Sequence, residues 1–288
     1  MNRFTIVFFT VIVCLLYCSC NIINPSEEIP SYIKIDTITF ENDPGQSISY
    51  QKITDAWVYV DDQLVGTYEL PVTFPVLAKG NRQILIRPGI IINGIGATRG
   101  IYPFFESYGK SVDLNPNETS VISPTVKYHS SYTLPWSANF ETEIKIERLP
   151  GSLSDIKRVT DPAILGPFNG IACGAILLDA DSNRFAGASL TDFPLSLPRT
   201  SQPIFLELSY KSNNLFSVGI IARNPEGDQG QTILNINPSS GWNKIYVNLT
   251  ETVNLNINAA GYYFFIHAQK SDDVSQAEIY IDDLKILY

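Results

Sequence analysis

Short segments in which apolar and polar residues alternate dominate the chain after residue 30. In "SYIKIDTITF" (31–40), for example, Ile33 and Ile35 fall on one side, and Lys34 and Asp36 fall on the other. Successive side chains of a β-strand point to opposite faces of its sheet, so this alternation predicts strands that are buried on one face. No segment carries a convincing long helical pattern. The predicted fold class is all-β.

The stretch from 56 to 90 predicts several strands joined by tight turns, at Asp61–Asp62 and at residues 79–81. Within it, "VYVDDQLVGTYELPVTFPV" (58–76) resembles the small PEGA-type β-sandwich, whose pattern is a strand, an Asp-Gly-like turn, a glycine and a proline-containing strand. Asp62 stands where that pattern has the turn glycine. The resemblance implies a small N-terminal β-sandwich over residues 33–128, acting as a spacer or docking module. Residues 129–139 are predicted to link it to a second domain.

Residues 140–288 contain eight further candidate strands bounded by Gly, Pro, Asn and Asp, which predicts a sandwich or barrel. Three stretches carry a more specific resemblance: "PIFLELSYKSNNLFSVGIIARN" (203–224), "SSGWNKIYVNLT" (239–250) and "AEIYIDDLKILY" (277–288). Their order is similar to that in the jelly-roll carbohydrate-binding-module and galactose-binding-like families. The resemblance implies a C-terminal jelly-roll β-sandwich, a fold that serves binding modules, enzymes and scaffolds alike.

The first twenty residues predict where in the cell the protein is located. Arg3 precedes an almost wholly apolar run from Phe4 to Tyr17, which is short for a membrane span and typical of a secretory signal. "YCSC" (17–20) resembles a bacterial lipoprotein signal of the Bacteroidetes-like type, which implies cleavage after residue 19 and palmitate-type acylation of Cys20. Residues 20–32 are then a lipidated tether. Asn21 after the cysteine, by the same resemblance, favours the outer membrane. An uncleaved helix and ordinary secretory cleavage are the alternatives.

Strand alternation also suggests where a ligand would lie. It predicts that several aromatic and polar side chains of the second domain point outward, and these are the candidate ligand-binding residues: Trp242, Tyr246, Tyr263, His267 and Tyr280. Aromatic rings with polar neighbours suit the apolar face and the hydroxyls of a sugar. The alternative is that these side chains pack under loops or against the first domain.

Oxygen ligands at alternate positions, Asp179, Asp181 and Asn183, are a candidate structural calcium site. An EF-hand is excluded by Arg184 and Leu190, which stand where that motif needs Gly and Glu. An acid-rich turn without an ion is the alternative. No other cofactor is predicted.

Composition and local motifs argue against several classes of function. The net charge is −9 with no basic stripe, so nucleic acid is not an expected partner. Gly94, Gly96 and Gly100 lack the helix that a phosphate-binding loop needs. Cys173 lies among apolar residues, which indicates an inert buried thiol. No catalytic motif is present, and an enzyme is not predicted. The expectation is a lipid-anchored envelope protein that binds a polysaccharide or an envelope protein complex; the alternative is a structural accessory subunit of an outer-membrane complex.

Overall fold

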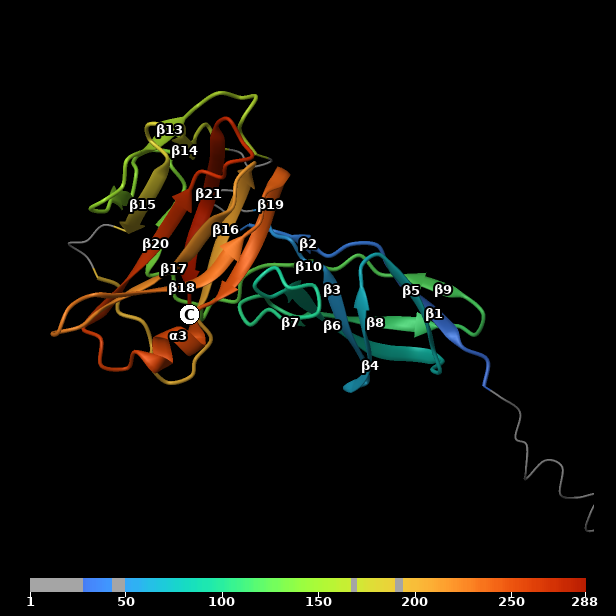
Figure 1. Ribbon diagram of the computed structural model, residues 1–288. Coiled ribbons are helices and arrows are strands. Elements are labelled where there is room, and N and C mark those ends of the chain that lie inside the picture. Colours follow the sequence, from blue (N-terminus) through green and yellow to red (C-terminus); the bar gives the residue numbers. More distant parts are fainter. Residues whose placement is uncertain (1–27, 43–49, 167–169, 190–193) are drawn as a thin grey trace, which may run out of the picture.

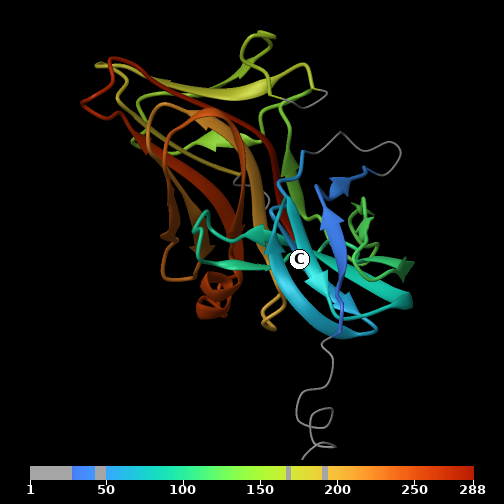
Figure 2. The same ribbon diagram turned by 90° about the vertical axis from the view of Figure 1, so that its right-hand side faces the viewer.

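A computed structural model describes residues 28–42, 50–166, 170–189 and 194–288. Two β-sheet domains lie side by side in it (Figures 1 and 2). The all-β prediction is confirmed: the described part of the chain contains one α-helix, α3 (Thr250–Leu255), against a large majority of strands. The predicted signal segment and Cys20 lie outside the described residues. In the described part, no helix is long and apolar enough to cross a membrane.

The first domain is a small β-sandwich, as predicted. Its strands are β1 (Ser31–Ile35), β2 (Thr39–Phe40), β3 (Asp55–Val60), β4 (Gln63–Glu69), β5 (Val72–Val76), β6 (Gly80–Ile91), β7 (Arg99–Ile101), β8 (Tyr108–Leu114), β9 (Thr119–Val121) and β10 (Thr125–Val126). One sheet has the order β5-β1-β9; the other has the order β4-β3-β6, with β7 and β8 both paired to β6. The apolar faces of these two sheets enclose a core that includes Ile33, Val58, Phe74 and Ile84.

The predicted tight turns are present in this domain. Asp61 and Asp62 connect β3 to β4 with φ values of 47° and 65°. Two successive positive φ angles are typical of the two-residue turn that matches the twist of a hairpin, and Asp tolerates them better than most residues. Gly80, at φ 73°, begins β6 after the second turn. Asp62 thus takes the place of the expected glycine without changing the turn.

The second domain is a jelly-roll sandwich of two antiparallel sheets. Its strands are β11 (Trp136–Ala138), β12 (Ile146–Arg148), β13 (Ile156–Val159), β14 (Cys173–Leu178), β15 (Arg184–Ser189), β16 (Phe205–Ser212), β17 (Phe216–Arg223), β18 (Gln229–Ile236), β19 (Ser239–Asn248), β20 (Gly261–Gln269) and β21 (Ala277–Leu287). The sheet that faces the first domain, here the junction sheet, has the order β13-β14-β21-β16-β19, with β11 also paired to β21. The far sheet has the order β12-β15-β20-β17-β18.

The two domains share a hydrophobic cluster. Tyr102, Phe105 and Tyr128 of the first domain pack against Phe205 and Tyr246 of the second. The ring centroids of Tyr102 and Tyr246 are 4.9 Å apart, and those of Tyr102 and Phe205 are 5.3 Å apart. Such aromatic contacts bury much apolar area and fix ring geometry, so they hold one domain against the other.

Main-chain contacts add to this interface. Ile92, just after β6, forms a parallel bridge with Tyr246 at the edge of the junction sheet. Gly94 follows at φ 66°, and a Cβ atom there would lie 3.1 Å from Ile245 Cδ1. This glycine therefore serves a positive φ and a close approach between domains. Within the segment predicted to be a linker, residues 136–138 form β11 and belong to the junction sheet.

Candidate functional site

The structure does not bring the five candidate ligand-binding residues together. Trp242, Tyr246 and Tyr280 lie on β19 and β21, on the outward face of the junction sheet. Tyr263 and His267 lie on β20, in the far sheet on the opposite side of the sandwich. The alternation had assigned the core side of β20 correctly, because Tyr262, Phe264 and Ile266 are fully buried between the sheets.

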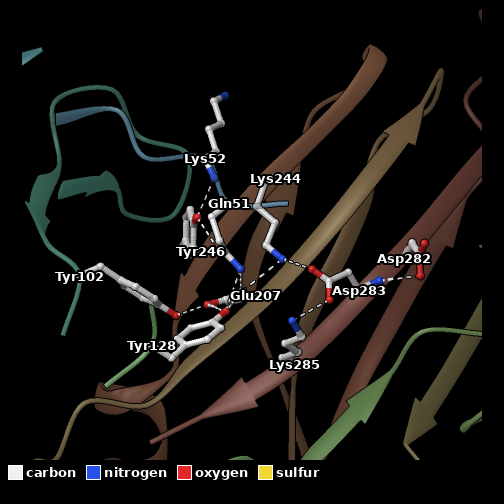
Figure 3. Close-up of polar contacts among 10 residues, drawn as sticks. All are labelled: Gln51, Lys52, Tyr102, Tyr128, Glu207, Lys244, Tyr246, Asp282, Asp283 and Lys285. Carbon is white, nitrogen blue, oxygen red and sulfur yellow. Dashed lines mark hydrogen bonds and ion pairs between the residues drawn. The ribbon is translucent and has the colours of Figure 1, made fainter. Parts of the chain in front are cut away.

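Tyr246 is covered by the first domain and belongs to a buried polar network (Figure 3). Only 1% of its surface is exposed, and its hydroxyl donates to Gln51 Oε1 (2.8 Å) and accepts from the main-chain N–H of Lys52 (2.9 Å). The centre of this network is Glu207 on β16, which has no exposed surface. Its carboxylate accepts hydrogen bonds from the Tyr102 hydroxyl (2.7 Å) and the Tyr128 hydroxyl (2.8 Å).

Among the described residues, the two cations of this network, Lys244 and Lys285, both come from the second domain. Lys244 Nζ lies 3.2 Å from Glu207 Oε2 and 2.6 Å from Asp283 Oδ2, and Lys285 Nζ lies 2.9 Å from Asp283 Oδ1. Asp283 reaches this face because of a β-bulge in β21, where its φ is 49°. Each buried charge thus has an opposite charge beside it, as burial requires.

Burial and pairing shift the acid–base behaviour of these groups. Burial opposes the charged form of Lys244, but the neighbouring Asp283 and Glu207 carboxylates outweigh it and raise the lysine pKa. Burial likewise works against ionised Asp283, yet Lys244 and Lys285 hold its pKa below the usual value. Burial, reinforced by Glu207, raises the pKa of Tyr102, Tyr128 and Tyr246 far above that of free tyrosine. The phenols therefore stay protonated and act as donors to Glu207 or Gln51, which is a structural role.

Trp242 and Tyr280 lie under a loop of their own domain. They cluster with Cys173 and Ala175 beneath Ile164 and Leu165, and the indole N–H of Trp242 donates to the Ile164 carbonyl (2.8 Å). The predicted alternative, packing under a loop, therefore describes this pair. Burial also raises the pKa of the Cys173 thiol to about 12, in agreement with the expected inert cysteine.

The outward face of the far sheet, here called the far face, lies on the side of the sandwich away from the first domain and carries three aromatic residues of β20. Tyr263 is buried and its hydroxyl accepts from Arg223 Nη1 (2.8 Å), while Phe265 and His267 are half-buried. Phe265 was not among the candidate ligand-binding residues. A Cβ atom on Gly219 would lie 2.6 Å from Phe265 Cε1 and 2.8 Å from its Cζ, so the Phe265 ring extends over the main chain of β17.

Small residues flank these rings on the neighbouring strands. Phe265 is paired with Ala188 on β15 and with Gly219 on β17; His267 is paired with Ala186 and Ser217. Ala188 and Gly219, beside Phe265, are buried, whereas Ala186 and Ser217, beside His267, are partly exposed. The Ser217 hydroxyl donates to Asn235 Oδ1 (2.7 Å), which adds a hydrogen-bonding edge next to His267.

A cavity of about 280 Å³ lies between the domains at the edge of the junction sheet. Lys52, Ile91 and Asn93 line it from the first domain, and Tyr210 and Asn243 are among the residues that line it from the second. Lys52 Nζ donates to Asn243 Oδ1 (2.8 Å), and Asn243 Nδ2 donates to the Tyr210 hydroxyl (3.2 Å).

The candidate calcium residues form a hydrogen-bonded turn between β14 and β15. Asp179 Oδ1 accepts from the main-chain N–H groups of Asp181 (3.0 Å) and Ser182 (2.7 Å). Within the described ranges, no group of three or more His, Cys, Asp or Glu side chains is arranged to hold a metal ion. Asn183 makes its contact through its carbonyl, which accepts from the main-chain N–H of Lys270 (2.8 Å). The structure adds no support for calcium here.

The sequence did not identify the residues at the centre of the junction. Glu207 sits in "IFLELSY" (204–210), where alternation places it on the outward face. An acid between two buried leucines is ordinary for a strand with one solvent face. The nearest signal was the aromatic run from Tyr102 to Phe105 in the other domain, which no local pattern connects to Glu207.

No protein-family model matches the chain, and a search of curated proteins found no match. Among solved structures, the family 22 carbohydrate-binding module of Clostridium thermocellum Xyn10B is 12% identical, with a TM-score of 0.33 over 53% of this chain and 91% of that one. The family 11 module from Clostridium thermocellum is 14% identical, with a TM-score of 0.38 over 54% and 94%. An exo-beta-agarase is 12% identical, with a TM-score of 0.36 over 55% and 24%.

Proposed function

We propose that this protein is a non-catalytic, glycan-binding protein of the cell envelope, and that the glycan lies across the far face. The observation that carries the proposal is the Phe265 ring, half-buried and extended over Gly219 between strands that bear only small residues beside it. An aromatic ring that lies along a sheet offers a flat apolar surface to the C–H face of a pyranose.

Polar groups suited to sugar hydroxyls surround this ring. His267, one pair of residues along β20, offers a ring nitrogen, and the Ser217–Asn235 pair offers an amide and a hydroxyl. Arg223 is exposed at the end of β17 and is oriented by its hydrogen bond to Tyr263. A few placed polar groups around an apolar platform are what a sugar site needs for orientation.

Catalysis is not part of the proposal. The carboxylates of the junction, Glu207 and Asp283, are engaged by lysines and phenols within the protein. Burial raises the pKa of Asp282 to about 7, as a general acid would need, but the same burial leaves only 4% of this residue exposed to a substrate.

We further propose that acylated Cys20 holds the protein on the outer membrane. Ten residues, 21–30, separate Cys20 from β1, a tether that spans at most about 35 Å when fully extended. Mass spectrometry of the N-terminal peptide tests this: the proposal expects a diacylglyceryl-type modification on Cys20, and an unmodified thiol there contradicts it.

A polysaccharide panel tests the binding function. The panel should include β-1,3-1,4-mixed-linked glucan, the linkage of the tetrasaccharide in the family 11 complex. Phe265→Ala and His267→Ala are each expected to lower affinity for the bound polysaccharide about fivefold, because one aromatic contact contributes on the order of 1 kcal/mol.

Tyr59→Ala is the matched control. Tyr59 is a half-buried aromatic on β3 of the first domain, with the Arg87 guanidinium 5.2 Å from its ring centroid. This variant should bind as the wild type does. Equal retention of all four proteins on every polysaccharide would refute the proposed site.

The alternative from another class is a structural accessory subunit of an outer-membrane complex. The observation that favours it is β4, a seven-residue edge strand of the first domain that pairs on one side with β3. Unpaired strand edges are templates for another chain. Co-purification with a membrane complex, sensitive to a proline at Thr67 on β4 and accompanied by no glycan affinity, would support this alternative.

A further inference from the structure

We infer that the cavity between the domains is a second ligand site, selective for a small hydroxylated carboxylate such as a uronic acid. The cavity lies at the edge of the junction sheet, where the first domain meets β18 and β19, and Asn235 is the one residue that it shares with the proposed far-face site. At about 280 Å³ it is at the small end of ligand pockets, which suits a single sugar ring rather than a chain.

Lys52 supplies the charge for this selectivity. No Asp or Glu lines the cavity, and no acidic side chain in the described part of the chain forms an ion pair with Lys52. The other lysine in the lining, Lys244, is already neutralised by Glu207 and Asp283. An ammonium with a neutral amide as its partner retains donors for an anion.

The position of Lys52 is fixed by the domain junction. Its main-chain N–H donates to the Tyr246 hydroxyl (2.9 Å), and the neighbouring Gln51 donates to Glu207 Oε2 (3.1 Å). Its side chain then reaches across to Asn243 on β19. The ammonium is therefore placed before a ligand arrives, which lowers the entropic cost of binding.

Tyr210 supplies a second, independent indication. Tyr210 belongs to the core of the second domain, with 5% of the residue exposed, and it is also one of the residues that line the cavity. Its hydroxyl oxygen accepts from Asn243 Nδ2, and the hydroxyl proton has no acceptor among the described residues. A buried donor without an acceptor is costly, and a ligand oxygen would satisfy it.

The rest of the lining fits the ring of a sugar acid. Asn93 Oδ1 accepts from the main-chain N–H of Asn248 (2.8 Å), so the Asn93 amide N–H₂ remains to donate. Ile91, Ile95 and Ile245 add apolar surface for ring carbons. Oxygen acceptors on a ligand would satisfy the free donors of Lys52, Tyr210 and Asn93, and a carboxylate beside Lys52 would be the strongest of these acceptors.

Isothermal titration of the full, acylated chain tests the inference, in a detergent without sugar headgroups. Galacturonic acid and galactose form a matched pair of probes that differ in the carboxylate. The acid is expected to bind at least tenfold more tightly than galactose. Lys52→Met should lower affinity for the acid at least tenfold, and Tyr210→Phe should lower it about fivefold.

Lys34→Met is the control, because Lys34 is a partly exposed lysine on β1 of the same domain that does not line the cavity; it should leave the affinity unchanged. Phe265→Ala should also leave it unchanged, which separates this site from the far face. Melting curves check that each variant is folded. Equal binding of acid and neutral sugar, full affinity in folded Lys52→Met, or no binding of either probe would overturn the inference, whatever the far face binds.

Discussion

Glu207 and Lys244 form an ion pair in which neither side chain has any exposed surface; Oε2 and Nζ are 3.2 Å apart. Both residues come from the second domain, but hydroxyls of the first domain complete the environment of the carboxylate. Removing two charges from water is costly, and the cost is offset only where the remaining donors and acceptors are also satisfied. The domains must therefore meet in one arrangement for this pair to be stable, and the pair specifies how they pack.

Replacing Glu207 by Leu should be strongly destabilising. The change leaves the Tyr102 and Tyr128 hydroxyls buried without their acceptor and removes one of the two anions beside Lys244. We expect a loss of about 3–5 kcal/mol in the free energy of unfolding, measured by urea denaturation. The exposed pair Lys34–Asp36 is the comparison: Asp36→Ala should cost less than about 1 kcal/mol.

A double-mutant cycle shows whether the ion pair itself is responsible. Glu207→Leu with Lys244→Met should cost less than the sum of the single changes by at least about 1 kcal/mol, because neither charge then remains without its partner. Additive losses would contradict the coupling claimed for these two residues.

Asp282 should make stability fall as pH rises from about 4 to about 7. Burial raises the pKa of this carboxyl to about 7, whereas an unfolded Asp titrates near 3.9. Between about pH 4 and 7 the folded protein holds a proton that the unfolded chain releases, so the contribution of this group to the free energy of unfolding decreases with pH.

Asp282→Asn removes that titration while keeping an acceptor for the main-chain N–H of Asp283. We expect the variant to be about 1–3 kcal/mol more stable than wild type at pH 8 and close to it at pH 4.5. The depressed pKa of Asp283 acts in the opposite sense, but it is common to both proteins. Urea denaturation at several pH values measures the difference; parallel pH curves would contradict this assignment.

Gly219 is expected to be required for the position of Phe265. A Cβ atom there would overlap the Gln231 carbonyl oxygen and lie 2.6 Å from Phe265 Cε1. Gly219→Ala should lose about 1–3 kcal/mol of stability and weaken binding of the polysaccharide as well. Gly230→Ala is the control on the adjacent strand, since its Cβ would meet only Ile221 Cγ1, at 3.8 Å. The same melting temperature and binding in both variants would show that the ring does not depend on this contact.

Cys173 should be unreactive in the folded protein. Its thiol is buried, and burial, with Asp282 nearby, raises its pKa to about 12, so almost no thiolate is present at pH 8. Modification by a disulfide reagent should be slower than that of free cysteine by several orders of magnitude and become rapid in urea. Rapid reaction without denaturant would mean that the thiol is accessible and activated.

The alternation of apolar and polar residues correctly predicted those strands whose core-facing side chains are large and apolar. β16, β17, β20 and β21 all carry regular apolar positions, and Tyr262, Phe264 and Ile266 were assigned to the core correctly. β15 was not recognised as a strand, because its sequence "RFAGAS" has little hydrophobic signal. The same small residues flank Phe265 and His267, so the feature that concealed the strand helps to form the proposed site.

The interface between the two domains could not be predicted from the sequence, for a different reason. Periodicity reports which face of a strand is apolar, and Tyr246 was placed outward correctly. That this face meets a second domain depends on contacts between residues more than 100 positions apart, such as Tyr102 with Glu207. Two of the candidate ligand residues, Trp242 and Tyr280, were likewise placed on the outward face, but a loop that no local pattern assigns to that position covers them.

Hydrogen exchange of the full chain, measured with and without a polysaccharide that it retains, tests the proposed function most directly. Binding at the far face predicts slower exchange in peptides covering β17, β18 and β20, centred on residues 216–223 and 261–269, with little change in β19 and β21. Protection confined to β19 and β21, or no protection by any polysaccharide in the panel, would contradict binding at the far face.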